Sequence, residues 1–383
     1  MDPKTMRDKF LGSIIGAAIG DAIGAPFEFW DQERLKQHPH GTEWIEDMLP
    51  FVGRKKGPRG VWRDDPPVGT GTDDTRLNMV LVEAVIKYGK HLNSRLLAAE
   101  FIDRYLNVDR YYPGYHDLAT EHFEPDFITA CGLLEIECPA LPGVPPYALK
   151  SGAQLRGGIP SHYGLWALPA AGLLHPGNPE EAYRHTFELA YMTIGYATDA
   201  TALLAAMIAA GFDESLSPRE AIQKGLEVDP FQLGHWQGRG MRLWHRTTVE
   251  CLNRYCDLAE QAKSDRELVL MISKEMQHVS PLDAIDVLGI AVAACYRSNG
   301  DPRRAVLMAA NERDLNDKGE FKRFRDIDCT ASACGALAGA LAPTGVNGFP
   351  ANWVSAVIAA NCEVYGFDLK ANAEHRYEVG TRR

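Results

Sequence analysis

Two short stretches of the sequence place acidic side chains at the start of an apolar helical run. In the first, residues 69–75 read Gly-Thr-Gly-Thr-Asp-Asp-Thr, so that Asp73 and Asp74 stand together among hydroxyl groups. In the second, Asp326 and Asp328 directly precede a run of small, apolar residues. Acids one or two positions apart do not share a helix face, so both pairs belong at a helix start or in the loop before it. We therefore expect the two stretches to assemble one cation site.

The donor types indicate which cation this would be. Carboxylate and hydroxyl oxygens are hard ligands, and neither stretch carries a pair of histidines or cysteines. Such donors favour Mg²⁺ or Mn²⁺ over Zn²⁺. The simpler alternative is that Thr72 or Asp73 is an ordinary N-cap and that the acids complement the helix dipole.

Two acids near the N-terminus are further candidates. Asp21 lies in an apolar run whose glycines, at positions 12, 16, 20 and 24, recur every fourth residue, a spacing that lets another helix approach closely at the centre of a bundle. Asp21 is either a buried polar strut or a partner of the metal site, and we expect the strut because buried acids must find hydrogen bonds. Glu28 is flanked by aromatic residues, which would raise its pKa, as suits a general acid or base. An exposed loop acid is the alternative.

Three blocks of sequence occur in a recognisable order. The first reads Gly-Ala-Ala-Ile-Gly-Asp-Ala-Ile-Gly-Ala-Pro-Phe-Glu-Phe at 16–29, and the second reads Thr-Asp-Asp-Thr at 72–75. The third is Asp-Ile-Asp at 326–328, followed by Gly-Ala-Leu-Ala-Gly-Ala at 335–340. Together they resemble the ADP-ribosylglycohydrolase family, which includes the enzyme that removes ADP-ribose from dinitrogenase reductase and the animal ADP-ribosyl-acceptor hydrolases. The resemblance implies an all-α fold, a single orthogonal multi-helix bundle over residues 1–383.

The resemblance also implies a centre of two Mg²⁺ ions, with Mn²⁺ as the alternative, and cleavage of the bond between the anomeric carbon of a ribose and its acceptor. The partner would be an ADP-ribosylated protein or a ribosylated small molecule. The cations would bind the vicinal ribose hydroxyls and orient a water toward the anomeric carbon. Glu28 would close over the substrate, and Glu28 and Asp74 are the catalytic candidates. The metal ligands would be Thr72, Asp73, Asp74, Asp326, Asp328 and Cys329.

Cys329 departs from the usual family motif, Asp-x-Asp-Thr, in which the threonine hydroxyl is a metal ligand. A thiol is a soft donor and is poorly matched to Mg²⁺. Three outcomes are open: the sulfur turns away and one metal position weakens, Thr330 takes over, or the site prefers Mn²⁺ or Zn²⁺. We expect the first, because Thr330 lies about 100° further round the helix.

Two segments are candidates for binding the rest of the substrate. Residues 152–164 correspond to a glycine-rich segment that helps to hold ADP-ribose in many family members, although the common Gly-Asn-Gly wording is missing. A basic loop at 53–63, with one tryptophan, is expected to be a solvated loop, as most charge runs of this size are; the alternative is that it contacts a diphosphate and stacks on adenine. A lone loop histidine such as His162 more often has no chemical role. The substrate-binding candidates are Arg156, Gly157, Ser161 and His162.

Composition and charge exclude several classes of function. The 383 residues carry 40 Lys and Arg against 51 Asp and Glu, a net charge of −11, which argues against a nucleic-acid partner because phosphate binding depends on basic residues. The eight cysteines show no CxxC pair and no zinc-type spacing, so we expect reduced thiols. No apolar stretch of bilayer length lacks charge or proline, so we expect a cytoplasmic protein without a membrane partner.

Helical periodicity continues through most of the chain, with two irregular segments. Residues 31–71 are predicted to be a long loop and residues 138–164 a Pro/Gly-rich connector. No βαβ alternation, complete Walker loop or dinucleotide GxGxxG is present. Among the predicted helices are 94–106, 126–137, 182–192, 197–210, 218–227, 244–256, 261–277, 282–297 and 350–365, and a polar tail follows the last.

Three functions remain open at this point. The first is a metal-dependent glycohydrolase that releases ADP-ribose from a protein acceptor. The second is a hydrolase of a small ribosylated metabolite or nucleoside, favoured if residues 152–164 leave no room for adenosine diphosphate. The third is a non-catalytic binder, favoured if the metal centre is incomplete.

Overall fold

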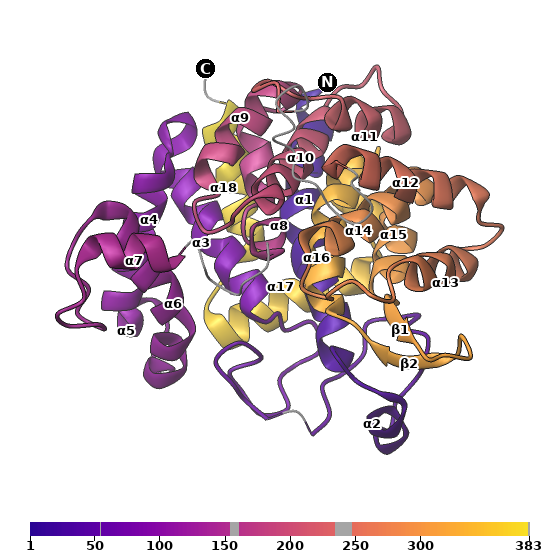
Figure 1. Ribbon diagram of the computed structural model, residues 1–383, viewed down its shortest axis with the longest axis horizontal. Coiled ribbons are helices and arrows are strands. Elements are labelled where there is room, and N and C mark those ends of the chain that lie inside the picture. The colour runs from indigo at the N-terminus through magenta and orange to yellow at the C-terminus, as the bar shows by residue number, and fades with distance from the viewer. Residues whose placement is uncertain (54, 154–160, 234–246, 382–383) are drawn as a thin grey trace.

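The computed structural model describes residues 1–53, 55–153, 161–233 and 247–381, and almost all of its regular structure is helical, which confirms the all-α expectation (Figure 1). The longer helices are α1 (Pro3–Gly24), α3 (Asp73–Tyr88), α4 (Ser94–Leu106), α6 (His116–Leu134), α9 (Pro179–Leu189), α10 (Tyr196–Ala210), α12 (Thr248–Gln261), α13 (Asp265–Glu275), α14 (Ala284–Ser298), α16 (Ile327–Leu341), α17 (Ala351–Tyr365) and α18 (Leu369–Thr381). The shorter helices are α2 (Gln32–Gln37), α5 (Val108–Tyr111), α7 (Pro146–Ala153), α8 (Tyr163–Ala167), α11 (Pro218–Leu226) and α15 (Pro302–Ala309). Short 3-10 helices are η1 (Ala25–Phe27), η2 (Gly89–His91), η3 (Pro169–Leu174) and η5 (Gly345–Gly348).

The centre of the molecule is the pair formed by α1 and α16, which lie side by side in Figure 1. The glycines of α1 face small residues of α16, and the two backbones touch. A Cβ added to Gly20 would lie 1.9 Å from the carbonyl oxygen of Ala331, and one added to Gly24 would lie 2.4 Å from the backbone nitrogen of Asp328. The close approach predicted from the glycine spacing is therefore confirmed, and it holds the acidic start of α16 against the end of α1.

Other helices surround this pair on both sides. Helices α4 to α7 gather on one side of the molecule, and α3 lies between them and α1 (Figure 1). Helices α12 to α15 gather on the other side, where α14 and α15 pack against α16. One hydrophobic cluster contains buried residues from Phe10 to Ala373, so elements from both ends of the sequence share one core.

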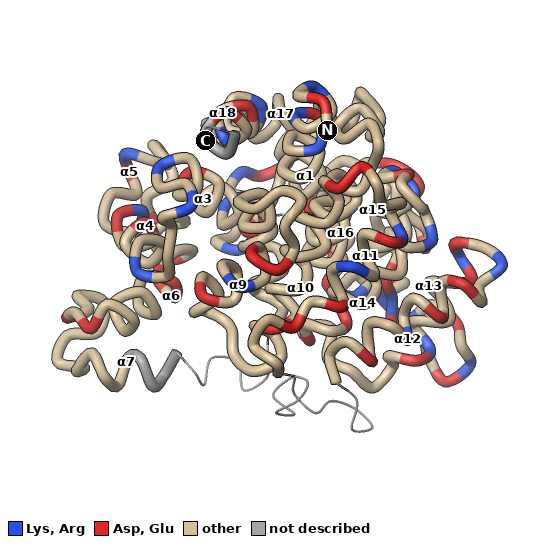
Figure 2. The backbone as a smooth tube through the Cα atoms, turned by 90° about the horizontal axis from the view of Figure 1, so that it is seen from above, with Lys and Arg blue, Asp and Glu red and all other residues tan. Residues whose placement is uncertain are grey.

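Charged residues lie mainly on the outer helices. Figure 2 shows Lys and Arg interspersed with Asp and Glu along α12 and α13. The segment Pro3–Phe27 is long and apolar enough to cross a membrane by length and composition, but its apolar window is buried inside the fold. The apolar character of α1 is thus accounted for by its place at the centre of the molecule.

The segments expected to be irregular contain short helices. The loop at 31–71 includes α2, and the connector at 138–164 includes α7. The polar tail predicted after residue 365 contains a helix that the sequence pattern did not indicate, α18. Its Arg376 is buried and donates to the carbonyl oxygen of Leu173, so the helix is tied into the core.

Two further elements differ from the prediction. The helix expected at 126–137 begins already at His116, and Pro125 lies inside it. Residues 313–324 form an antiparallel hairpin of β1 (Arg313–Leu315) and β2 (Phe321–Phe324). These strands are too short for an alternating pattern to be seen in the sequence. Helix α4, in contrast, has the predicted bounds.

Candidate active site

Asp21, near the end of α1, holds the start of α3. Its carboxylate accepts hydrogen bonds from the backbone N–H and the hydroxyl of Thr72 and from the same two groups of Thr75, at 2.5 to 3.1 Å. Thr72 precedes α3 but makes no side-chain cap bond, so a carboxylate from α1 takes the place of an N-cap. Burial raises the pKa of Asp21, and the threonine bonds oppose this shift. The predicted strut is confirmed, and it fixes the segment that carries Asp74.

The acids of the two distant stretches meet where α3 and α16 begin. The Sγ atom of Cys329 lies 3.3 Å from Oδ1 of Asp74. The possible ligand atoms of Asp74, Asp328 and Cys329 all lie within 4.8 Å of one another. Asp326 is the residue before α16, and Asp328 lies in its first turn. Asp74, Asp326 and Asp328 are all buried, so the structure places three carboxylates together away from solvent.

Glu28 reaches the same centre from the turn after α1. Its carboxylate lies within 4.8 Å of those of Asp326 and Asp328. The next residue, Phe29, has φ +55°, a left-handed conformation that costs roughly 1–2 kcal/mol for an L-residue. The Phe29 N–H donates to the carbonyl oxygen of Arg325 at 3.1 Å, so this turn is tied to the residue before Asp326. The resemblance set Glu28 apart from the metal ligands, and the structure holds its carboxylate beside two of those expected ligands through this backbone contact.

His162 joins the centre from another part of the chain. Its Nε2 atom lies 3.2 Å from Oδ2 of Asp326, and its Nδ1 atom lies 2.7 Å from the carbonyl oxygen of Leu282. A carbonyl only accepts, so Nδ1 carries a hydrogen and Nε2 faces the carboxylate. Burial would lower the pKa of His162, but Asp326 raises it above its ordinary value. No pattern in the sequence identifies this role, because only the fold brings His162 to Asp326.

The centre holds more negative charge than its hydrogen bonds balance. Burial, and then the neighbouring carboxylates, raise the pKa values of Asp74 and Asp328 well above their ordinary range. The buried atoms Oδ2 of Asp74 and Oδ1 of Asp326 have no hydrogen-bond partner among the described residues. A divalent cation satisfies clustered carboxylate oxygens of this kind. The residues present therefore fit a divalent metal.

The centre opens into a cavity of about 650 Å³, a size typical of small-molecule sites. Burial raises the pKa of Asp73, one of the lining acids, to about 7, with Arg76 opposing the shift and Glu28 adding to it. The walls also carry aromatic and apolar side chains, which suit a ligand with both a polar and an apolar part. The lining residues are Glu28, Phe29, Arg59, Gly60, Asp73, Leu77, His122, Pro125, Asp126, Ser161, His162, Tyr163, Trp166, Met192, Thr193, Ile194, Leu282, Asp326, Asp328 and Cys329.

The remaining predicted site residues have different places. The hydroxyl of Thr72 donates to Asp21. Asp73 lines the cavity. Ser161 also lines the cavity, and its hydroxyl accepts from the N–H of Tyr163. Arg156 and Gly157 lie outside the described residues.

The expectation that the sulfur of Cys329 turns away from the centre is wrong. Because the start of α16 faces that of α3, the thiol points inward and donates to Asp74. Thr330 does not take over as a ligand. Its hydroxyl lies 2.8 Å from both the carbonyl oxygen of Asp326 and Oε2 of Glu312, an acid outside the group of Asp74, Asp326 and Asp328.

The basic loop at 53–63 contributes little to the cavity. Among its described residues, Arg59 and Gly60 line the cavity. Trp62 is buried, its indole N–H donates to the carbonyl oxygen of Pro58, and the guanidinium of Arg76 lies 4.2 Å above its ring. The alternative in which this tryptophan stacks on adenine is wrong, because the ring is part of the core.

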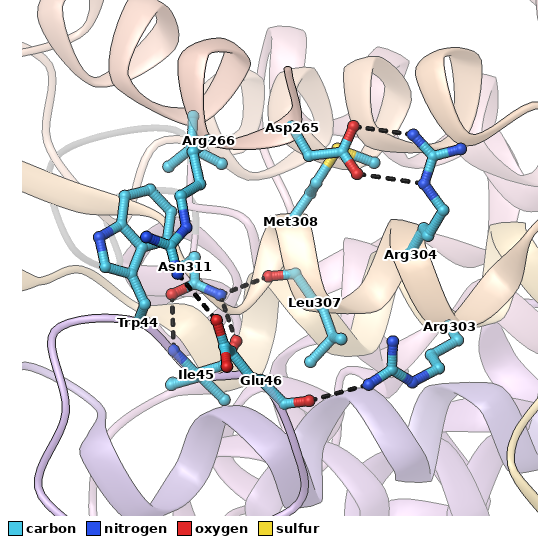
Figure 3. Close-up of a pocket in the computed structure, with 11 residues that line it drawn as sticks. Trp44, Ile45, Glu46, Asp265, Arg266, Arg303, Arg304, Leu307, Met308 and Asn311 are labelled. Atoms are coloured by element: carbon cyan, nitrogen blue, oxygen red, sulfur yellow. Dashed lines mark hydrogen bonds and ion pairs between the residues drawn. The ribbon is translucent and has the colours of Figure 1, made fainter.

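A second cavity, of about 360 Å³, lies between the loop after α2 and helices α13 and α15 (Figure 3). Its charged side chains make ion pairs or hydrogen bonds with other residues that line the cavity. Arg266 pairs with Glu46, Arg304 pairs with Asp265, and Arg303 donates to the carbonyl oxygen of Glu46. The cavity contains none of the predicted site residues, so we place the chemistry at the carboxylate centre.

The fold and the site together define a class: an all-helical protein whose central helices bring buried carboxylates to a cavity of ligand size. The sequence model of the ADP-ribosylglycohydrolase family matches residues 2–376, nearly the whole chain, and the protein belongs to this family of glycohydrolases. The chain is also similar to the uncharacterized protein YegU of Escherichia coli (strain K12), with 29% identity over 104 residues. That alignment covers 27% of this chain and 29% of the relative.

Proposed function

We propose that this protein is a divalent-metal-dependent glycohydrolase that cleaves the bond between the anomeric carbon of ADP-ribose and a protein acceptor. The main observation behind the proposal is that the buried carboxylates of Asp74, Asp326 and Asp328 cluster beside the 650 Å³ cavity, with Glu28 next to them. Carboxylates suit this reaction because positive charge develops on the sugar ring as the leaving group departs. Mg²⁺ is the proposed cation, and Mn²⁺ is the alternative.

Asp74, Asp326 and Asp328 are the residues that would hold the metal, with the carboxylate of Glu28 beside them. When bound, a divalent cation supplies positive charge that orients the vicinal ribose hydroxyls and a water molecule. Asp21 contributes by position, because its bonds to the threonines on either side of the Asp73–Asp74 pair keep that pair in place. The unpartnered oxygens of Asp74 and Asp326 support this assignment.

Proton transfer is assigned to the less buried carboxyl groups. Glu28 is half-buried and lines the cavity, so its Oε atoms can take a proton from water and return it to the leaving group. Asp73 is a second group that can carry a proton near neutral pH, since its pKa is raised to about 7. The guanidinium of Arg59 is the proposed contact for a phosphate.

A specific observation favours a second candidate, a hydrolase of a small ribosylated metabolite or nucleoside. Among the described lining residues Arg59 is the one arginine or lysine, against the five acids Glu28, Asp73, Asp126, Asp326 and Asp328. A diphosphate would meet net repulsion in such surroundings unless other basic residues reach it. A neutral ribosyl compound would not be repelled by these acids.

One assay separates these candidates. Purified protein with Mg²⁺ is incubated with ADP-ribosyl-arginine, O-acetyl-ADP-ribose and simple nucleosides, and the products are followed by chromatography. Release of ADP-ribose from the arginine conjugate, stopped by a chelator, is the expected result. Cleavage of nucleosides alone would favour the second candidate. If Mg²⁺ and Mn²⁺ support cleavage of none of these compounds, both proposals fail.

Glu28→Gln is expected to lower kcat by at least about 100-fold while weakening metal binding by less than about tenfold, because general acid–base catalysis contributes about 10² to 10⁴ in rate. Glutamine keeps the size of the side chain and loses the titrating group. Steady-state kinetics across pH, with calorimetry of Mg²⁺ binding, gives both numbers. A wild-type rate across the pH range would remove Glu28 from the mechanism, and a metal affinity lost as fully as the rate would make it mainly a ligand.

A further inference from the structure

We propose that His162, Asp326 and Cys329 form a binding site for one transition-metal dication of the Zn²⁺ class, beside the carboxylate position that suits Mg²⁺ or Mn²⁺. The ligand atoms are Nε2 of His162, a carboxylate oxygen of Asp326 and Sγ of Cys329, which all lie within 4.8 Å of one another. Nitrogen, oxygen and sulfur donors together are typical of Zn²⁺ and Co²⁺ sites, whereas Mg²⁺ takes oxygen donors. The inference rests on the centre assigned in the proposed function and names the metal class of one of its positions.

The orientation of His162 is the first support. Its Nδ1 atom donates to the carbonyl oxygen of Leu282 at 2.7 Å, the kind of contact that fixes the tautomer and the ring orientation of a ligating imidazole. Nε2 is therefore the atom that faces Oδ2 of Asp326, at 3.2 Å. Two ligands with bonds of about 2.0–2.1 Å to a tetrahedral Zn²⁺ ion lie about 3.3 Å apart. The observed separation thus already suits a shared ion.

The side chains of Asp326 and Cys329 give the second support. Asp326 is 4% exposed, and its Oδ1 atom has no hydrogen-bond partner among the described residues. The Cys329 thiol points at the same group of oxygens, 3.3 Å from Oδ1 of Asp74. A coordinating metal displaces the proton of a thiol and gains a thiolate ligand.

Asp326 also belongs to an all-oxygen group with Glu28 and Asp328, whose ligand atoms again lie within 4.8 Å. A carboxylate has two oxygens and can serve two neighbouring cations. The centre therefore offers one position with oxygen donors and one with a histidine and a cysteine, and Asp326 is common to both. The cysteine at 329 then changes which metal binds at its position and does not leave that position empty.

The test uses Co²⁺ as a spectroscopic probe, with no substrate present. The full-length protein is stripped with a chelator under reducing conditions, and Co²⁺ is added in steps while the absorption spectrum is recorded. A thiolate bound to Co²⁺ gives a charge-transfer band in the near ultraviolet. We expect this band to grow to one equivalent, to survive a large excess of Mg²⁺ and to disappear when one equivalent of Zn²⁺ displaces Co²⁺.

Three variants make the assignment specific. Cys329→Thr is expected to remove the band, lower Zn²⁺ affinity by at least about tenfold and raise Mg²⁺ affinity, since a hydroxyl replaces the soft donor. His162→Gln is expected to lower Zn²⁺ affinity by a similar factor with the fold intact by circular dichroism. Cys362→Ser, at an exposed free cysteine, is the matched control and should leave the band unchanged.

The proposal is overturned if the parent protein gives no thiolate band, if the band persists in Cys329→Thr, or if Mg²⁺ at millimolar concentration removes it. These outcomes do not depend on turnover. A protein that hydrolyses ADP-ribosyl-arginine with Mg²⁺ but gives no Co²⁺ band would keep its proposed function and lose the site described here. A protein that gives the band but cleaves no ribosyl compound would keep the site described here and lose its proposed function.

Discussion

Replacing Gly20 with alanine is expected to destabilise the protein by about 3 kcal/mol or more, because the new methyl group would overlap the backbone of α16. A Cβ at this position would lie 1.9 Å from the carbonyl oxygen of Ala331 and 2.6 Å from the backbone nitrogen of Ser332. Backbone atoms cannot rotate aside as the end of a side chain can, so the two helices would have to separate. Chemical denaturation gives the free energy of unfolding that checks this.

The direction of the change in the free energy of unfolding is informative, because replacing glycine with alanine at an exposed helix position stabilises the helix by about 1 kcal/mol. Gly57→Ala is the matched control, since a Cβ there would meet nothing within 4 Å. We expect its free energy of unfolding to stay within about 0.5 kcal/mol of the parent. A Gly20→Ala variant as stable as the parent would mean that α1 and α16 do not touch as described.

Asp328→Asn is expected to weaken divalent-metal binding by at least about 100-fold, because loss of even a supporting residue around a metal commonly costs about 10- to 100-fold. Without metal, the variant should be as stable as the parent or more so. Burial, Glu28, Asp74 and Asp326 all disfavour the charged form of Asp328, and the amide carries no charge. Asparagine also keeps the oxygen that accepts from the N–H of Cys329.

Calorimetric titration with Mg²⁺ and Mn²⁺, with melting temperatures in the presence and absence of metal, measures both effects. Asp265→Asn, in the second cavity, is the control acid. It pairs with Arg297 and Arg304, so its loss should lower stability without changing metal affinity. Equal Mg²⁺ affinity of Asp328→Asn and the parent would disprove a metal site at the start of α16.

The fold was largely predictable because its main features are local or periodic. The glycine spacing of α1 indicated a close helix contact, and the apolar run after Asp328 indicated a buried helix, although neither pattern named its partner. The hairpin β1–β2 and helix α18 were missed. The strands are only a few residues long. The sequence of α18 is polar, and the burial of its Arg376 could not be predicted from that sequence.

The site was predictable where acids cluster at helix starts and unpredictable where the fold alone supplies a neighbour. Asp74, Asp326 and Asp328 lie together as the two motifs suggested. His162 stands alone in the sequence, and its contact with Asp326 depends on the path of the whole chain. Stacking of Trp62 on a ligand was one alternative, because a tryptophan in a basic loop has the same sequence pattern whether its ring faces a ligand or the core.

The pairing of α1 with α16 joins a helix that is synthesised early to one that is synthesised late, so the centre of the molecule cannot form until α16 has been made. Contacts between residues so far apart require a large loop to close first, which costs entropy and slows folding. During synthesis α1 is exposed long before its partner exists, which makes it a candidate for chaperone binding or misassembly. We therefore expect this protein to fold more slowly than helical bundles built from local contacts.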